Sequence, residues 1–181
     1  MIAARVIGGG PSNASFTIAL DRGERDGIRR DMGVITPDGV VGKIIDAFPN
    51  TSQVLLLTDT KSGVGAKLAD SGIQSPVGGL GEPLLDMKYF PNDDDVSVGA
   101  RVVTSGMDHI FPRDLPVGTI TEVKAGNPFK QIRVKPAASL EKLEEVLVLL
   151  TLRPFREPEP VAVKPEVPQA SNSTPAQVAH P

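Results

Sequence analysis

The sequence predicts an all-β protein made of many short strands, and three observations predict it. The 181 residues include 18 Gly and 17 Pro, so residues that favour turns interrupt the chain at short intervals. Apolar residues occur in short runs or alternate with polar ones, which is typical of strands. No long stretch repeats apolar residues with the helical period. Without its last 28 residues the chain is still long enough to bury roughly two-thirds of its unfolded surface.

The first third of the chain contains a clear alternating strand and a clear hairpin. Phe16, Ile18 and Leu20 alternate with smaller or polar residues, as in a half-buried strand. The turn at 37–39 reads Pro-Asp-Gly, in which Pro presets one backbone dihedral and Gly supplies the positive one. The strands expected here are 5–7, 15–20, 34–36, 40–45 and 54–57, with a charged turn over 21–30.

The remaining strands follow from similar patterns, with one short helical segment among them. Pro76 makes its segment an edge or irregular strand, because proline donates no ladder hydrogen bond. Ser139 is a plausible N-cap for at most two helical turns over 139–145. The expected strands are 64–68, 73–80, 84–90, 98–104, 117–124, 131–135 and 146–152.

The stretch 102–118, VVTSGMDHIFPRDLPVG, holds the one cluster that suggests catalysis. Ser105, Asp108 and His109 lie within five residues, so a trypsin-like hydrolase using Ser105 and His109 is the alternative function. Working triads are assembled from residues far apart in sequence. Val103 also stands where a nucleophile elbow needs Gly. We therefore expect no catalytic residue here and no enzyme.

Composition argues against several other classes. The formal net charge of −3 gives no electrostatic footprint for nucleic acid. Cys is absent, so disulfides and thiolate metal sites are excluded. The acidic run 93–95 is interpreted as a solvated loop, and no metal or cofactor is expected. A sugar-binding module is weakened by the absence of Trp and the presence of one Tyr.

Four segments, in the same order, resemble the bacterial rod shape-determining MreC family. They are DRGERDGIRRDMGVITPDGVVGKI from Asp21, SQVLLLTD from Ser52, the TSG, IFP and PVG elements between 104 and 118, and VKPAASLEKLEEVLVLL from Val134. The resemblance covers about 4–152. Two departures are Ala100, where the family usually has Asp, and residues 107–109, which replace the usual glycines.

The resemblance implies a fold of two small six-stranded β-barrels packed together. We expect the first barrel lobe in 2–59 and 117–153, and the second in 60–116. Seven of the 28 residues in 154–181 are proline, which predicts a disordered Pro-rich tail.

The resemblance also implies a function: a non-enzymatic scaffold of the complex that synthesises peptidoglycan during elongation and maintains rod shape. Such proteins self-associate and bind the class B penicillin-binding transpeptidase, MreD and other elongation components. They lie on the periplasmic or extracytoplasmic face of the inner membrane, held by an N-terminal anchor. No basic region followed by an apolar run begins this chain, so we expect a soluble extracytoplasmic fragment without that anchor.

Phe48 and Phe129 are the candidate partner-binding residues. Each sits in a turn rich in Pro, Gly or Asn, which brings the chain to the surface. A Phe at such a turn either folds back as a plug on a barrel end or projects as an anchor for a partner. The sequence leaves both hypotheses open.

Overall fold

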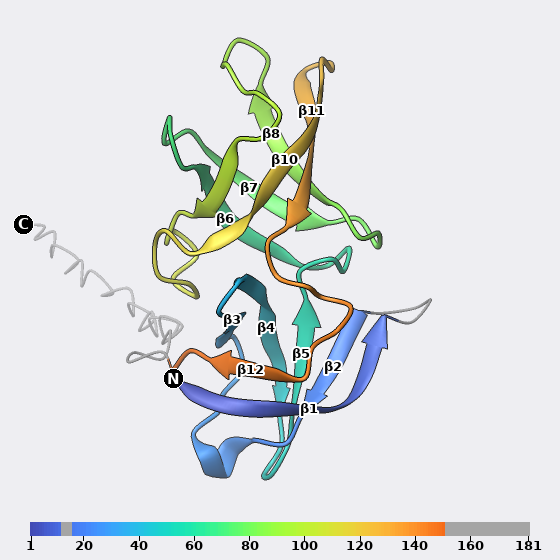
Figure 1. Ribbon diagram of the computed structural model, residues 1–181. Helices are drawn as coiled ribbons and strands as arrows, with labels where there is room; N and C mark the ends of the chain where they lie inside the picture. Colours follow the sequence, from blue (N-terminus) through green and yellow to red (C-terminus); the bar gives the residue numbers. More distant parts are fainter. Residues whose placement is uncertain (12–15, 151–181) are drawn as a thin grey trace, which may run out of the picture.

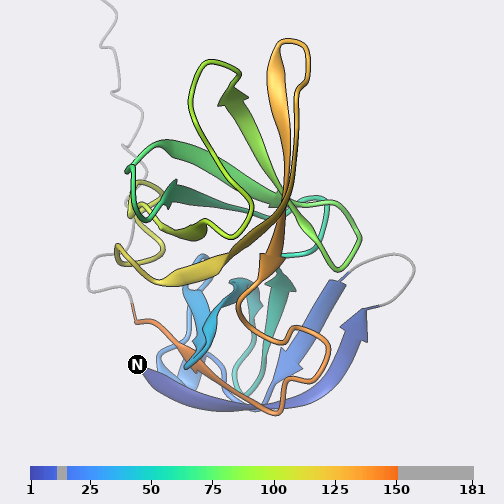
Figure 2. The ribbon, with the colours of Figure 1, turned by 45° about the horizontal axis from the view of Figure 1, so that its top comes forward.

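The computed structural model describes residues 1–11 and 16–150, which form two closed six-stranded antiparallel barrels. The barrels lie one above the other, and two views of the molecule agree on this arrangement (Figures 1 and 2). The predicted all-β fold with two packed barrels is therefore confirmed. The expected Pro-rich tail, 154–181, lies outside the described residues.

The first barrel contains the N-terminal strands and the last strand of the described chain. In spatial order its strands are β1 (Ile2–Pro11), β12 (Glu145–Val148), β3 (Gly33–Thr36), β4 (Gly39–Ala47), β5 (Ser52–Leu56) and β2 (Phe16–Leu20). A short 3-10 helix, η1 (Glu24–Asp26), lies in the charged turn expected over 21–30.

The second barrel is continuous in sequence. In spatial order its strands are β10 (Pro116–Lys124), β11 (Phe129–Pro136), β8 (Leu85–Pro91), β7 (Gln74–Gly79), β6 (Gly63–Leu68) and β9 (Arg101–Thr104). We expected 117–153 to complete the first barrel, but β10 and β11 pair with β9 and β8 of the second barrel instead. Local patterns locate strands, whereas their partners depend on long-range packing. Among the described strands that follow β9, β12 alone returns to the first barrel.

Residues 139–144 form a turn and bends and Glu145 already belongs to β12, so the expected helical turns are wrong. The Lys142 N–H donates to the Ser139 carbonyl at 3.4 Å. Ala138 and Leu140 are buried and belong to the hydrophobic cluster. A segment this short has little intrinsic helical stability, and packing of its apolar side chains decides its conformation.

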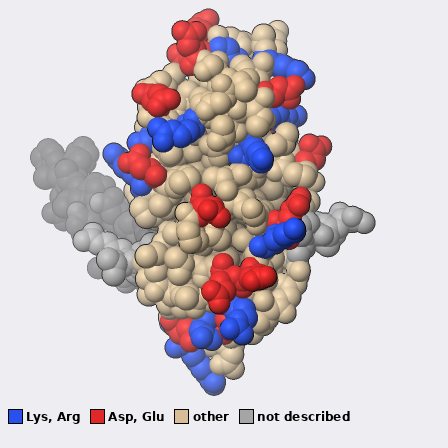
Figure 3. All heavy atoms as spheres, in the orientation of Figure 1, with Lys and Arg blue, Asp and Glu red and all other residues tan. Residues whose placement is uncertain are grey.

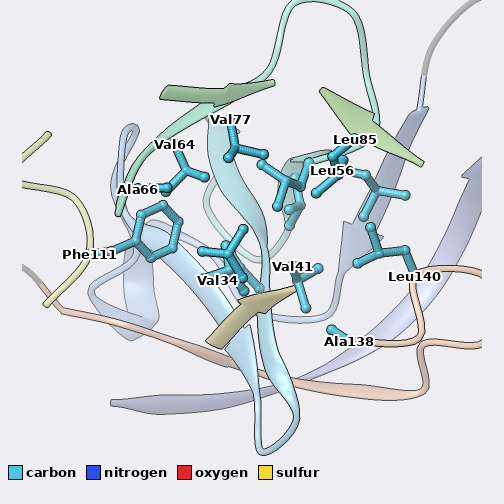
Figure 4. Packing of buried hydrophobic residues seen from close by; sticks show 14 of the residues in the cluster. Val34, Val41, Leu56, Val64, Ala66, Val77, Leu85, Phe111, Ala138 and Leu140 are labelled. Carbon is cyan, nitrogen blue, oxygen red and sulfur yellow. The ribbon is translucent and has the colours of Figure 1, made fainter. Parts of the chain in front are cut away.

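One hydrophobic cluster runs through both barrels and across the layer between them. Val34, Val41 and Leu56 of the first barrel and Val77 and Leu85 of the second belong to it. Figure 4 shows these side chains directed into the shared layer, with Phe111 among them. The two barrels therefore share a buried apolar layer that stabilises their packing.

The chain crosses between the barrels through a tightly packed segment after β5. Asp59 is 4% exposed, and its carboxylate accepts the Phe16 N–H at 3.1 Å and the Lys61 N–H at 2.8 Å. Gly79 packs so closely on this segment that an added Cβ would lie 2.3 Å from the Thr58 carbonyl oxygen. Asp59 thus ties β2 of the first barrel to the crossing segment.

Candidate functional site

The loop 105–115, which follows β9, is organised by the carboxylate of Asp108. Its Oδ1 accepts the N–H groups of Ile110 at 3.0 Å and Phe111 at 3.2 Å. Its Oδ2 accepts the Gly65 N–H of β6 at 3.1 Å. A carboxylate that accepts several backbone N–H groups is well satisfied. Asp108 therefore fixes the loop and holds it against β6.

Ser105 and His109 do not form the catalytic arrangement of the hydrolase alternative. Ser105 is 5% exposed, and its hydroxyl accepts the Met107 N–H at 3.4 Å. His109 is exposed at a backbone φ of 57°. Within the described ranges no hydrogen bond links Ser105 to His109 or links His109 to a carboxylate. The nearby carboxylate of Asp108 accepts backbone N–H groups instead. The hydrolase alternative is not supported.

The same loop carries Phe111, whose ring is 4% exposed and lies against β3 of the first barrel. The Phe of the IFP element is thus a contact between the barrels. The sequence pattern that resembled a catalytic cluster encodes a loop that packs the two barrels together.

Phe129 lies at the far end of the second barrel, beside an aromatic residue that the sequence analysis did not single out. Tyr89 is 66% exposed and Phe129 is 41% exposed. Their ring centroids are 5.5 Å apart and the rings are nearly perpendicular, at 87°. Edge-to-face pairs at this separation are favourable. The structure therefore presents two aromatic rings together on an exposed surface.

Tyr89 is exposed because the strand changes phase at this residue. Leu85 and Met87 point inward, and simple alternation would place Tyr89 inside as well. Tyr89 instead has a φ of 59°, and the completely buried residue is Phe90. The sequence gives no clear local signal of this switch.

A shallow cleft surrounds the Tyr89–Phe129 pair, between the ends of β8 and β11. Its rim is formed by Lys88, Asn127, Pro128, Lys130 and Gln131, among others. The turn before β11 is held by Asn92, whose Nδ2 donates to the carbonyls of Gly126 at 2.8 Å and Pro128 at 2.7 Å. We call this surface, centred on Tyr89 and Phe129, the aromatic cleft.

A lysine on the rim of the aromatic cleft lies near the buried ring of Phe90. The Lys130 ammonium donates to the Asp94 carbonyl and lies 6.0 Å from the centroid of the Phe90 ring. This distance is within the range of a cation–π contact. The acidic run 93–95 is thus linked to β11 through the backbone carbonyl of Asp94. In the described residues, no three His, Cys, Asp or Glu side chains lie close enough together to hold a metal ion.

Phe48 lies in the turn between β4 and β5 of the first barrel, and its side chain is 52% exposed. Its backbone is fixed on both sides: its N–H donates to the Thr51 carbonyl, and its carbonyl accepts the Glu24 N–H, both at 2.8 Å. The turns at β4–β5 and β10–β11 lie at opposite ends of the molecule (Figure 1). The structure therefore does not bring Phe48 and Phe129 together, and both side chains are partly exposed.

Charged side chains of both signs are interspersed over the face shown in Figure 3. At the end of β10, the Lys124 ammonium lies 2.5 Å from the Glu122 carboxylate. The hydrogen bond and the positive charge of Lys124 lower the pKa of Glu122.

None of the described residues forms a helix that is long and apolar enough to cross a membrane.

Comparison with known proteins places the chain among tandem β-barrel proteins of one family. The family model described as rod shape-determining protein MreC, barrel core, matches residues 6–150. The cell shape-determining protein MreC of Cereibacter sphaeroides is 35% identical over 156 residues, which cover 85% of this chain and 51% of that protein. The MreC of Listeria monocytogenes is 34% identical over 155 residues, which cover 81% of this chain and 52% of that protein.

Solved structures agree with the family match. A crystal structure of MreC from Pseudomonas aeruginosa superimposes with a TM-score of 0.77 at 31% identity, covering 82% of this chain and 97% of that one. The fold thus defines a structural, non-enzymatic class of two-barrel proteins. The chain belongs to the rod shape-determining MreC family. It spans about half the length of the curated relatives described above.

Two more distant structures share the fold. One is the major periplasmic domain from the cell shape-determining filament MreC, with a TM-score of 0.69 at 23% identity, covering 80% of this chain and 92% of that one. The other is the complex between Penicillin-Binding Protein (PBP2) and MreC from Helicobacter pylori. Its TM-score is 0.62 at 15% identity, and the match covers 80% of this chain and 96% of that one. At these identities the likeness extends to the fold alone.

Proposed function

We propose that this chain is the barrel part of a non-enzymatic scaffold in the complex that builds the cell wall during elongation. Membership of the MreC family supports a role in cell shape. The scaffold acts on the periplasmic side of the inner membrane, anchored by a part of the protein outside this chain, and MreD is among its partners. The distant relative described as a periplasmic domain supports this location.

The proposed partner is the elongation transpeptidase, a class B penicillin-binding protein. The H. pylori MreC is in complex with a penicillin-binding protein, and it shares the two-barrel fold with this chain. The observation that carries the proposal is the exposed Tyr89–Phe129 pair. Aromatic side chains that project from a rigid surface often dominate the binding energy of an interface. We therefore assign the transpeptidase contact to the aromatic cleft.

Self-association is the second part of the proposed function, and Phe48 is its candidate contact. Phe48 lies at the end of the molecule opposite the aromatic cleft. A contact that joins two different surfaces of identical subunits generates an open filament when the rotation between subunits does not close a ring. The distant relative described as a filament is consistent with such assembly.

The test is a binding titration with the purified elongation transpeptidase, using the full-length protein to which this chain belongs. We expect Phe129→Ala to weaken binding by about 2 kcal/mol or more, which is roughly a 30-fold rise in Kd. Val98→Ala is the matched control, since Val98 is 63% exposed and lies outside the aromatic cleft. Wild-type affinity of both Phe129→Ala and Tyr89→Ala would reject the assignment of this surface.

Phe48→Ala is tested separately by sedimentation, which measures self-association. We expect this variant to shift the distribution toward monomers while its affinity for the transpeptidase stays unchanged. An unchanged distribution would remove Phe48 from the proposed self-association contact.

A further inference from the structure

The outer half of strand β10 is an unpaired sheet edge. β9 pairs with β10 at 116–119, and Ile120 makes the last backbone hydrogen bonds on that side, with Gly99 and Ala100. In the described chain, β10 beyond Ile120 has β11 as its one strand neighbour. The β10–β11 hairpin projects from the end of the second barrel (Figures 1 and 2). We call residues 121–124 the β10 edge.

An edge of this kind is a template for pairing with a further strand, because part of its backbone N–H and C=O groups point away from its neighbour. Proteins commonly protect such edges with charged side chains. The β10 edge carries Glu122 and Lys124, which share one face and form an ion pair at 2.5 Å. Val123 lies on the opposite face and packs against the hydrophobic cluster. The strand that pairs here must therefore match these charges.

The charges of this face belong to an alternating row across the sheet. Glu122 lies opposite Arg133 of β11, and Arg133 lies opposite Asp86 of β8. The Arg133 guanidinium is 3.6 Å from the Asp86 carboxylate. The row thus runs from negative to positive to negative, and it ends at the β10 edge with Glu122. A positive side chain opposite Glu122 on an added strand continues the alternation, and opposite-charge pairs across strands are favourable.

A second copy of β10 meets this requirement in one antiparallel register. With Val123 opposite Val123 of the second copy, each Glu122 lies opposite a Lys124, so both cross-strand pairs are attractive. A shift of two residues in either direction places Lys124 opposite Lys124 or Glu122 opposite Glu122, which is unfavourable. A shift of one residue turns the apolar face of one strand toward the charged face of the other. The charge pattern therefore selects the register centred on Val123.

We propose that two copies of this chain pair through their β10 edges, in antiparallel orientation and centred on Val123. The pairing joins β8, β11 and β10 of both copies into one continuous sheet. The inference deepens the self-association part of the proposed function and rests on it for its role: together with the Phe48 contact at the opposite end, this contact links molecules into an open chain (Figure 1). The aromatic cleft lies between β8 and β11, so the transpeptidase contact uses a different surface.

Charge reversal tests the register, because the ion pairs cross between copies. The parent for the test is the Phe48→Ala chain, which lacks the other proposed self-contact. Sedimentation of the parent up to about 1 mM, a range in which weak contacts are populated, should show dimers. Glu122→Lys and Lys124→Glu each place like charges opposite each other, and each should raise the dimer Kd by about tenfold or more. An equimolar mixture of the two variants restores both attractive pairs, so heterodimers should form in the mixture.

A control variant and a second measurement accompany the sedimentation. Glu82→Lys reverses an exposed charge outside the β10 edge and should dimerise like the parent. Circular dichroism should be unchanged in all variants, because the substituted side chains lie at the surface. Amides of the β10 edge should exchange more slowly with solvent at high concentration in the parent, and this protection should be absent in Glu122→Lys.

A parent that stays monomeric up to about 1 mM would overturn the proposal. A mixture of Glu122→Lys and Lys124→Glu that is no more dimeric than its separate components would overturn it as well, since the ion pairs would then not cross between copies. The test includes neither the transpeptidase nor the Phe48 contact, so its failure leaves the proposed function standing.

Discussion

The ring of Phe111, from the second barrel, lies directly on the backbone of Gly33, in strand β3 of the first. A Cβ added at Gly33 would lie 2.7 Å from Cε1 and 2.9 Å from Cδ1 of that ring. Carbon atoms in ordinary contact are about 3.5 to 4.0 Å apart. The absence of a side chain at residue 33 thus permits the close approach of the two barrels at this point.

We predict that Gly33→Ala destabilises the protein by about 1 to 3 kcal/mol, because it overpacks a buried contact. The destabilisation should largely vanish in a Phe111→Ala background, where the opposing ring is gone. A double-mutant cycle from denaturant unfolding measures this coupling. Gly63→Ala is the matched control, since its added Cβ would meet its nearest atom at 3.6 Å. Additive effects of Gly33→Ala and Phe111→Ala would contradict the prediction.

Asp108 is predicted to contribute to stability through the loop that presents Phe111. Asp108→Ala removes the acceptor of three backbone N–H groups, and we expect a loss of about 2 kcal/mol or more, since unsatisfied donors are costly. Asp108→Asn should lose less, because its amide oxygen can still accept from Ile110 and Phe111. Thermal melts of the two variants measure this order, and equal stability of both with the wild type would refute it.

Ser105 is predicted to have no catalytic role. Its hydroxyl makes one long hydrogen bond, to the Met107 N–H. Ser105→Ala should therefore change the free energy of unfolding by less than about 1 kcal/mol, as expected when a weak hydrogen bond is lost. It should also leave shape complementation of a rod-shaped host unchanged. Covalent labelling of Ser105 by a serine-directed phosphonate would show that this prediction is wrong.

The strands could be predicted from the sequence because their signals are local. The alternation at Phe16, Ile18 and Leu20 and the Pro-Asp-Gly turn before β4 needed no knowledge of distant residues. The assignment of β10 and β11 to a barrel was wrong for 117–136, because strand partners far apart in sequence leave no local pattern. Closure of each barrel depends on those distant pairings.

The candidate site could be predicted only in part. Phe129 was indicated by its turn, and its exposure agrees with a surface position. Tyr89 was missed, because its outward orientation depends on a positive φ at a non-Gly residue, for which the sequence gives no clear local signal. The role of Phe111 was missed because a contact between two barrels involves residues, such as Gly33, that are distant in sequence.

Asp59 is predicted to hold the crossing segment between the barrels. It is buried, and Asp59→Ala would leave the N–H groups of Phe16 and Lys61 without their carboxylate partner. We expect a loss of about 2 to 6 kcal/mol, from about 1 to 3 kcal/mol for each of the two unsatisfied donors. Hydrogen exchange should show faster exchange at the Phe16 and Lys61 amides. Unchanged protection of both amides would contradict the role assigned to Asp59.

The four phenylalanines 48, 90, 111 and 129 are predicted to divide into two groups by their effect on stability. Phe90 and Phe111 are 0% and 4% exposed, so truncation to Ala should destabilise the protein by about 3 to 5 kcal/mol. Phe48 and Phe129 are 52% and 41% exposed, so Phe48→Ala and Phe129→Ala should each change stability by less than about 1 kcal/mol, or roughly 2 to 4 °C in Tm for a domain of this size. Thermal melts of the four variants measure this division. A drop of more than about 4 °C for Phe129→Ala would show that its ring acts as a plug on the barrel end, and an anchor role would then require a second contact residue.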